Sequence, residues 1–93
     1  MKNVEVGMLA DIVNGTVVQL PGRRFPGIVI QGDSLMVLVD SVERVQVAVG
    51  RGAASEALDE LAELKLLLSQ YRSAYEGALL AEGVELPYTR RNT

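Results

Sequence analysis

The residues best suited to chemistry lie in one run, positions 20–35, which reads LPGRRFPGIVIQGDSL. Ser34 follows a short apolar stretch, and a serine hydroxyl in such a place can act as a nucleophile if a base activates it. The chain contains no histidine, the side chain that most often accepts a proton near neutral pH. We therefore interpret Asp33 and Ser34 as residues at a helix start, where side-chain oxygens accept hydrogen bonds from backbone amides.

The four residues Gly32-Asp33-Ser34-Leu35 resemble the nucleophile motif of the GDSL esterases and lipases. In that family a histidine and an aspartate near the C-terminus activate the serine, so the resemblance would imply such partners here. Without a histidine, and in a chain of 93 residues, a serine hydrolase is only a remote alternative. We expect no enzyme activity and no catalytic residue.

The arginines in the same run suggest a second kind of site. Arg23 and Arg24 stand between two Pro-Gly pairs, which favour turns. Arginine recognises carboxylates and phosphates, so these residues could form a small anion site with amides of the helix start at Ser34. The alternative is a solvated loop, or one arginine paired with Asp33. The candidate residues for binding a ligand or a partner are Arg23, Arg24, Phe25, Asp33 and Ser34.

Composition excludes several classes of function. The chain is 48% hydrophobic and 23% charged, which is typical of a globular domain rather than of a disordered or membrane-spanning one. It has no cysteine, which removes disulfides and thiolate chemistry, and with histidine also absent we expect no metal site and no cofactor. A net charge of -3 argues against nucleic acid as a partner. No signal-peptide core is visible, so we expect a cytoplasmic location and no membrane partner.

The first third of the chain predicts antiparallel strands. Asn14-Gly15 stands between β-branched runs, a strong signal for a hairpin with a type I′ turn. We expect strands at about 8–13 and 16–20, and a third strand at 28–31. Residues 4–13 also fit a helical stripe, and this alternative stays open.

The rest of the chain predicts two helices. For residues 34–49 the large apolar side chains recur every three or four positions, which favours a helix, although the alternating valines at 45–49 would also suit a strand. Residues 53–83 form the clearest helical pattern, with Ser55 as a possible cap and Gly83 at the C-terminal end. We predict one α+β domain over residues 1–93, with a small three-stranded sheet (1–33), a helical hairpin (34–49 and 53–83) and a tail (84–93).

Both helices carry a heptad pattern. On the second helix the predicted seam includes Leu61, Leu64, Leu68, Tyr71 and Tyr75, which we interpret as packing residues. On the first helix the matching stripe contains Leu35, Leu38, Val42, Val45 and Val49. A helix over 53–83 would be about 45 Å long, and apolar residues outside the seam, such as Leu58 and Leu66, imply burial on more than one side. We therefore expect a homodimer or higher homo-oligomer built on the long helix.

The longer run LPGRRFPGIVIQGDSL resembles a family of small, uncharacterised bacterial proteins that carry LPGR-x-FPG, two apolar residues and IQGDSL. Those proteins also end in a long helix and a short aliphatic-Pro-Tyr segment, which Leu86-Pro87-Tyr88 matches. The resemblance implies a bacterial, cytoplasmic protein and an intact small domain of unknown function. It implies no binding residues.

Two functions follow from these observations. The first is a non-catalytic interaction module that forms homo-oligomers and also binds another protein, as an immunity or accessory protein would. The second is a small domain that binds an anionic ligand through Arg23, Arg24 and the helix start at Ser34.

Overall fold

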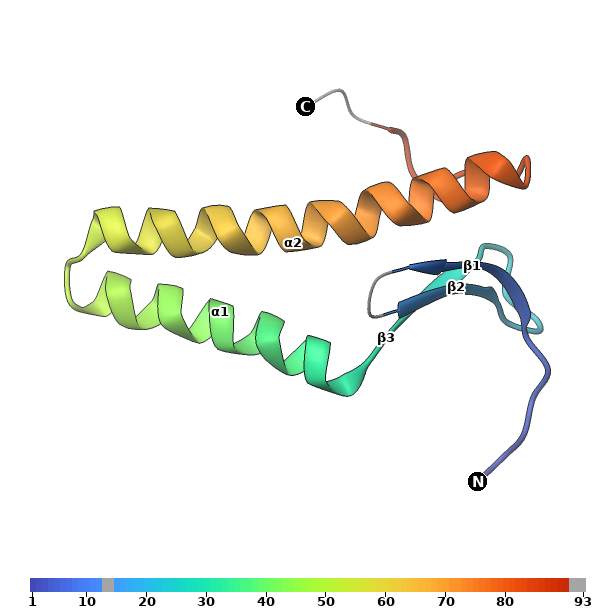
Figure 1. The fold of residues 1–93 in the computed structure, drawn as a ribbon, viewed down its shortest axis with the longest axis horizontal. Coiled ribbons are helices and arrows are strands. Elements are labelled where there is room, and N and C mark those ends of the chain that lie inside the picture. Colours follow the sequence, from blue (N-terminus) through green and yellow to red (C-terminus); the bar gives the residue numbers. More distant parts are fainter. Residues whose placement is uncertain (13–14, 91–93) are drawn as a thin grey trace. The chain divides into compact units, whose positions relative to one another are not determined.

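The computed structural model describes residues 1–12 and 15–90 of the chain. Three strands precede two helices, in the order β1, β2, β3, α1, α2, so the predicted α+β class is confirmed (Figure 1). The chain divides into two compact units. The sheet unit comprises residues 1–30 and the chain from Arg72 onward, and the hairpin unit comprises residues 31–71.

The three strands form one antiparallel sheet with β2 in the centre. The strands are β1 (Gly7–Ile12), β2 (Gly15–Gln19) and β3 (Gly27–Ile30). Val17 of β2 lies opposite Ala10 on one side and Ile28 on the other. Residues 7–12 therefore form the strand of the hairpin interpretation and not a helix. The predicted turn at Asn14 falls outside the described residues.

The loop after β2 is a tight turn of the kind that its Pro-Gly pair predicts. The Arg23 amide donates to the Leu20 carbonyl at 3.3 Å, and Gly22 has a φ of 75°. A proline followed by a residue with positive φ is typical of a type II turn. The Gln19 side-chain amide also donates to the Arg23 carbonyl at 2.6 Å, which ties the turn to the end of β2.

The core of the sheet unit forms between the central strand and the last turns of α2. Val17 and Leu79 are fully buried, and Tyr75 and Ala78 complete the buried cluster. The Tyr75 hydroxyl donates to the Pro26 carbonyl at 2.6 Å. Four partly buried side chains pack against this cluster: Leu9, Ala10, Ile28 and Leu86.

α1 (Gly32–Gly50) begins two residues before the predicted start, and its end is closed by a Schellman motif. Gly52, with a φ of 73°, donates to the Val49 carbonyl at 3.0 Å, and the Ala53 amide donates to Ala48 at 2.8 Å. This compact end lets the chain enter the next helix within a few residues.

α2 (Ala54–Ala81) is continuous through Gly77. The Ala57 amide donates to the Ala53 carbonyl at 3.0 Å, so Ser55 lies inside the first turn and not at the cap position that we predicted. The other end follows the prediction. Gly83 has a φ of 66°, and the Val84 amide donates to the Leu79 carbonyl at 2.9 Å, as in a Schellman motif.

In the hairpin unit α1 and the first part of α2 run antiparallel (Figure 1). Their buried residues are Ser41 and Ala48 on α1 and Ala57 and Leu64 on α2, so on each helix the two buried positions are seven residues apart. Half-buried residues at intervals of three and four complete what we call the seam: Ser34, Leu38, Ser41, Val45 and Ala48 on α1, and Ala57, Glu60, Leu64 and Leu67 on α2 together with Ala53 directly before it.

The seam differs from the predicted stripes by a rotation of each helix. The predicted residues Leu35, Val42 and Val49 of α1 and Leu61 and Leu68 of α2 are exposed. On α1 the small side chains Ser34, Ser41 and Ala48 take their places, because serine and alanine let two helices approach each other closely. On α2 the seam has Glu60 and Leu67 instead. A prediction that selects the largest apolar residues therefore chooses positions directly next to the seam. It still includes residues that do belong to the seam, such as Leu38 and Leu64.

Candidate interaction surface

The residues predicted to bind a ligand fall into two groups. Arg23, Arg24 and Phe25 belong to the sheet unit, and Asp33 and Ser34 belong to the hairpin unit. Both arginines are exposed. The Arg24 guanidinium lies 5.0 Å from the centre of the Phe25 ring, a cation–π geometry. One of the two arginines of the turn, Arg24, therefore already interacts with a neighbouring side chain.

The start of α1 also has an internal partner. The Asp33 carboxylate accepts a hydrogen bond from the Ser34 amide at 2.8 Å. The residue before the helix is Gln31, whose side chain makes no capping hydrogen bond. Asp33 thus supplies a negative charge in the first turn, where the helix dipole favours it. An external anion would have to compete with this carboxylate for the same end of the helix.

The predicted seam residues of α2 have different surroundings. Leu64 is buried in the hairpin unit, and Tyr71 is half-buried there. Tyr75 belongs to the core of the sheet unit. Leu61 and Leu68 are 47% and 48% exposed, so about half of each residue remains in contact with solvent.

Seven of the exposed large apolar side chains of the hairpin unit gather on one side, whereas Met36, Val37, Val47 and Leu66 lie elsewhere. Leu35, Val42 and Val49 each directly follow a seam residue of α1, and Leu61 and Leu68 do so on α2. One residue step turns an α-helix by about 100°, and the same step on two antiparallel helices leads to the same side of the pair. We call this surface the apolar face: Leu35, Val39, Val42 and Val49 of α1, and Leu58, Leu61 and Leu68 of α2. Its members are between 39% and 66% exposed.

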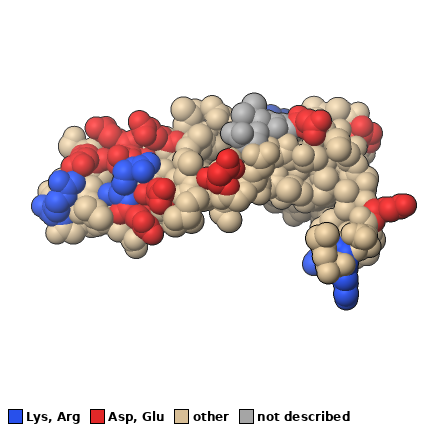
Figure 2. Space-filling view, turned by 60° about the horizontal axis from the view of Figure 1, so that its bottom comes forward, with Lys and Arg blue, Asp and Glu red and all other residues tan. Residues whose placement is uncertain are grey.

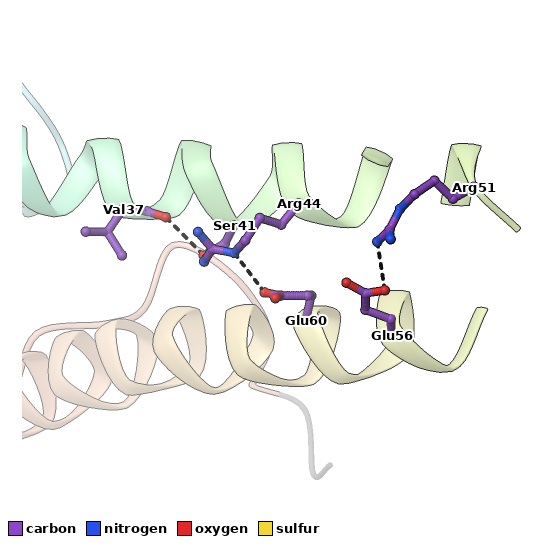
Figure 3. A network of polar contacts seen from close by, with 6 residues as sticks. All are labelled: Val37, Ser41, Arg44, Arg51, Glu56 and Glu60. Carbon is purple, nitrogen blue, oxygen red and sulfur yellow. Dashed lines mark hydrogen bonds and ion pairs between the residues drawn. The ribbon is translucent and has the colours of Figure 1, made fainter. Parts of the chain in front are cut away.

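The opposite side of the hairpin is charged and internally paired. Arg44 lies 3.0 Å from Glu60, and Arg51 lies 2.7 Å from Glu56 (Figure 3). Arg44 also donates to the Ser41 hydroxyl at 3.1 Å, and that hydroxyl donates to the carbonyl of Val37 at 3.0 Å. The hydrogen bond and the charge of Glu60 raise the pKa of Arg44. These contacts clamp α1 to α2.

An open hollow lies over these ion pairs. Its volume is about 280 Å³, and its lining consists of Glu43, Arg44, Val47, Arg51, Glu56 and Glu60. Figure 2 shows basic and acidic side chains interleaved over the part of the molecule that holds the hairpin. Because positive and negative groups already alternate and pair there, the hollow offers no concentrated charge to a ligand.

The C-terminal tail shapes a second, larger cleft within the sheet unit. It has a volume of about 450 Å³ and is lined by Arg72, Glu76, Tyr88 and Thr89. The Tyr88 hydroxyl donates to Glu76 at 2.9 Å, and Arg90 lies 3.5 Å from the same carboxylate. Burial, then the hydrogen bond and charge of Glu76, raise the pKa of Tyr88. The polar groups of this cleft therefore hold the tail on α2.

Sequence reasoning missed the ion pairs and the role of Ser41. The acidic residues Glu56 and Glu60 were visible only as a charged helix face. Pairing them with Arg44 and Arg51 needs the relative rotation of the two helices. The heptad spacing of Ser41 and Ala48 was the available signal, and it was hidden because neither residue is strongly apolar.

A comparison with protein families gives a match, which covers all three strands and both helices. The profile of a family of unknown function, DUF6959, matches residues 1–88. The chain belongs to this family. The expectation of a family without an assigned function is confirmed, and the match includes both the sheet and the two helices. No curated protein and no solved structure matches the chain.

The part of this DUF6959 chain that the structure describes was searched for metal ligands and for membrane-spanning helices. Within residues 1–12 and 15–90 no three acidic side chains come together as metal ligands would. In the same residues neither helix has a stretch that is apolar and long enough to cross a lipid bilayer.

Proposed function

We propose that this protein is a non-catalytic interaction module that self-associates through the apolar face of its helical hairpin. The single observation that carries the proposal is the gathering of seven large aliphatic side chains, each about half exposed, on one side of two helices. Contiguous apolar surface of this kind marks protein interaction sites in soluble domains.

Simple energetics support association. Full burial of a valine or leucine side chain contributes about 1.5–3 kcal/mol, so burial of the exposed halves of seven such side chains contributes about 5–10 kcal/mol per copy. Two copies together gain about 10–20 kcal/mol, against an association cost of about 4–15 kcal/mol. A dimer at micromolar concentration needs a net gain of about 8 kcal/mol, which lies within the range that these two figures span.

Sedimentation velocity at micromolar concentration tests the proposal. We expect the unmodified chain to sediment as a dimer or larger oligomer, and Leu61→Glu to sediment as a monomer, because a carboxylate in the apolar face would lose its hydration on association. Leu66→Glu is the matched control. Leu66 lies on the same helix and is 60% exposed, but it lies outside the apolar face. A monomeric unmodified chain, or equal effects of the two variants, would contradict the proposal.

A further inference from the structure

We infer that the partner of the apolar face is the same face of a second copy, and that α1 of each copy lies on α2 of the other in an antiparallel four-helix bundle. The inference rests on the proposed function and adds which helices meet. Most homodimers have two-fold symmetry, in which each copy offers the same surface patch. One exposed face on each copy satisfies that requirement.

The dimensions of the apolar face fit a second hairpin. α1 has 19 residues, which corresponds to a length of about 28 Å, and two packed helices are about 20 Å wide. The flat outline is therefore about 560 Å², and a standard interface buries about 800 Å² of corrugated surface on each partner. A single helix, about 10 Å wide, would leave one of the two apolar stripes in water. A hairpin covers both.

The charged side of the hairpin is a poor alternative for the contact. Arg44 and Arg51 already pair with Glu60 and Glu56 there, at 3.0 and 2.7 Å. A second copy on that side would remove water from both ion pairs without supplying new partners. On the apolar face it is mostly aliphatic groups that lose contact with water, and no ion pair is desolvated.

Lys65 discriminates between the two ways of stacking two hairpins. It is exposed and directly follows the seam residue Leu64, so it stands among the side chains of the apolar face. If α2 lay on α2, the two-fold axis would cross the α2 stripe near its middle, at about residue 63. The two Lys65 side chains would then be only about 6 Å apart along the bundle, and equal charges so close repel each other.

With α1 on α2 the same lysine has an acidic neighbour. The pairs Arg44–Glu60 and Arg51–Glu56 show which residues of the two helices are level, and by them Lys65 is level with residues 39–42 of α1. A two-fold axis parallel to the helices preserves these levels between copies. Lys65 then lies over this part of the second copy, beside Glu43 at the outer edge of its α1. Opposite charges at the edge of a helical bundle select the orientation of its partners.

Cysteine cross-linking tests this arrangement, and the natural chain has no cysteine to interfere. Two single variants, Val42→Cys and Leu61→Cys, are mixed at micromolar concentration and treated with a short bis-maleimide. We expect mixed dimers that join position 42 of one copy to position 61 of the other, as identified by mass spectrometry, and few dimers from either variant alone. A mixture of Val47→Cys and Leu66→Cys, both on exposed positions outside the apolar face, is the control and should give none.

The outcomes separate this inference from the proposed function. If the chain is a dimer by sedimentation but Val42→Cys links to itself, α1 lies on α1, and the inference is wrong while the proposed function stands. If only the control pair cross-links, the copies meet outside the apolar face, and both the inference and the proposed function are wrong. If the chain sediments as a monomer, both are wrong. In addition, Lys65→Glu should weaken the dimer at least tenfold, and Glu43→Lys in the same chain should restore it; a loss without restoration contradicts the arrangement.

Discussion

At the scale of single residues, Tyr75 connects the strands to the last helix. Its ring lies in the buried cluster with Val17 and Leu79, and its hydroxyl donates to the Pro26 carbonyl at 2.6 Å. Pro26 is itself buried, at the end of the loop that contains both Pro-Gly pairs. One side chain thus anchors the loop and fills the core.

Replacement of Tyr75 by phenylalanine should destabilise the protein. The ring is kept, but the buried Pro26 carbonyl loses its donor, which costs about 1–3 kcal/mol. Urea unfolding followed by circular dichroism measures the loss. Tyr71→Phe is the control, because Tyr71 is only half-buried and its hydroxyl forms no hydrogen bond within the described residues. Equal stabilities of the two variants would show that the Pro26 contact contributes nothing.

Alkaline pH should destabilise the protein through the same residue. Burial raises the pKa of Tyr75 above its ordinary value of about 10. The folded state therefore keeps the phenolic proton at pH values where the unfolded chain releases it. Stability is complete below about pH 10 and falls as the pH rises from there toward the raised pKa. The free energy of unfolding, measured from pH 8 to 11, should decrease less steeply for Tyr75→Phe; parallel curves would contradict this account.

At the scale of elements, one glycine inside α2 and one glycine just after it have opposite effects on stability. Gly77 lies inside the helix, is exposed, and has open space around the position of a Cβ. Gly83 follows the helix with a φ of 66°, in the left-handed region that other residues avoid. At either position a methyl side chain would find no other side chain within 4 Å, so the backbone conformation alone distinguishes the two glycines.

Alanine at these two positions should therefore shift stability in opposite directions. Gly77→Ala should raise the free energy of unfolding by about 1 kcal/mol, because alanine loses less backbone entropy in a helix. Gly83→Ala should lower it by about 1–2 kcal/mol, because alanine is strained in the left-handed region. Thermal unfolding of both variants in one buffer measures the difference. A destabilised Gly77→Ala would indicate a contact at that position that the structure does not show.

At the scale of the whole molecule, the apolar face links folding to association. The hairpin unit buries few large side chains within itself, chiefly Leu64, while seven aliphatic residues of the face stay half exposed. Contact with a second copy would extend that small core. Since a dimer stabilises only the folded state, its contribution depends on protein concentration.

The thermal midpoint should consequently rise with concentration. Between about 1 and 100 µM we expect an increase of several degrees for the unmodified chain, because mass action favours the folded dimer. Leu61→Glu should show a constant midpoint over the same range, and Leu66→Glu should behave as the unmodified chain does. Differential scanning calorimetry at four concentrations is sufficient. A midpoint independent of concentration in the unmodified chain would exclude coupling between folding and association.

The local elements of this protein follow from its sequence. The Pro-Gly pair at Pro21-Gly22 predicted the turn after β2, whereas the turn predicted at Asn14 falls outside the described residues. Gly83 predicted the end of α2, and the three-and-four spacing of apolar residues predicted both helices. These features depend on the conformations that single residues allow, and on periodicity along a few turns, so neighbouring positions contain the information.

Tertiary structure decided which side of each helix is buried. On α1 the stripes 34, 38, 41, 45, 48 and 35, 38, 42, 45, 49 have the same periodicity and share Leu38 and Val45, so spacing alone cannot choose between them. The close approach of α1 and α2 selects the stripe with Ser41 and Ala48, since small side chains fit between two adjacent helices. That rotation brings Arg44 to Glu60 and leaves Val42 and Leu61 exposed. The sequence by itself determined that apolar residues exceed what the hairpin can bury, whereas only the packing of the two helices determined where the excess lies.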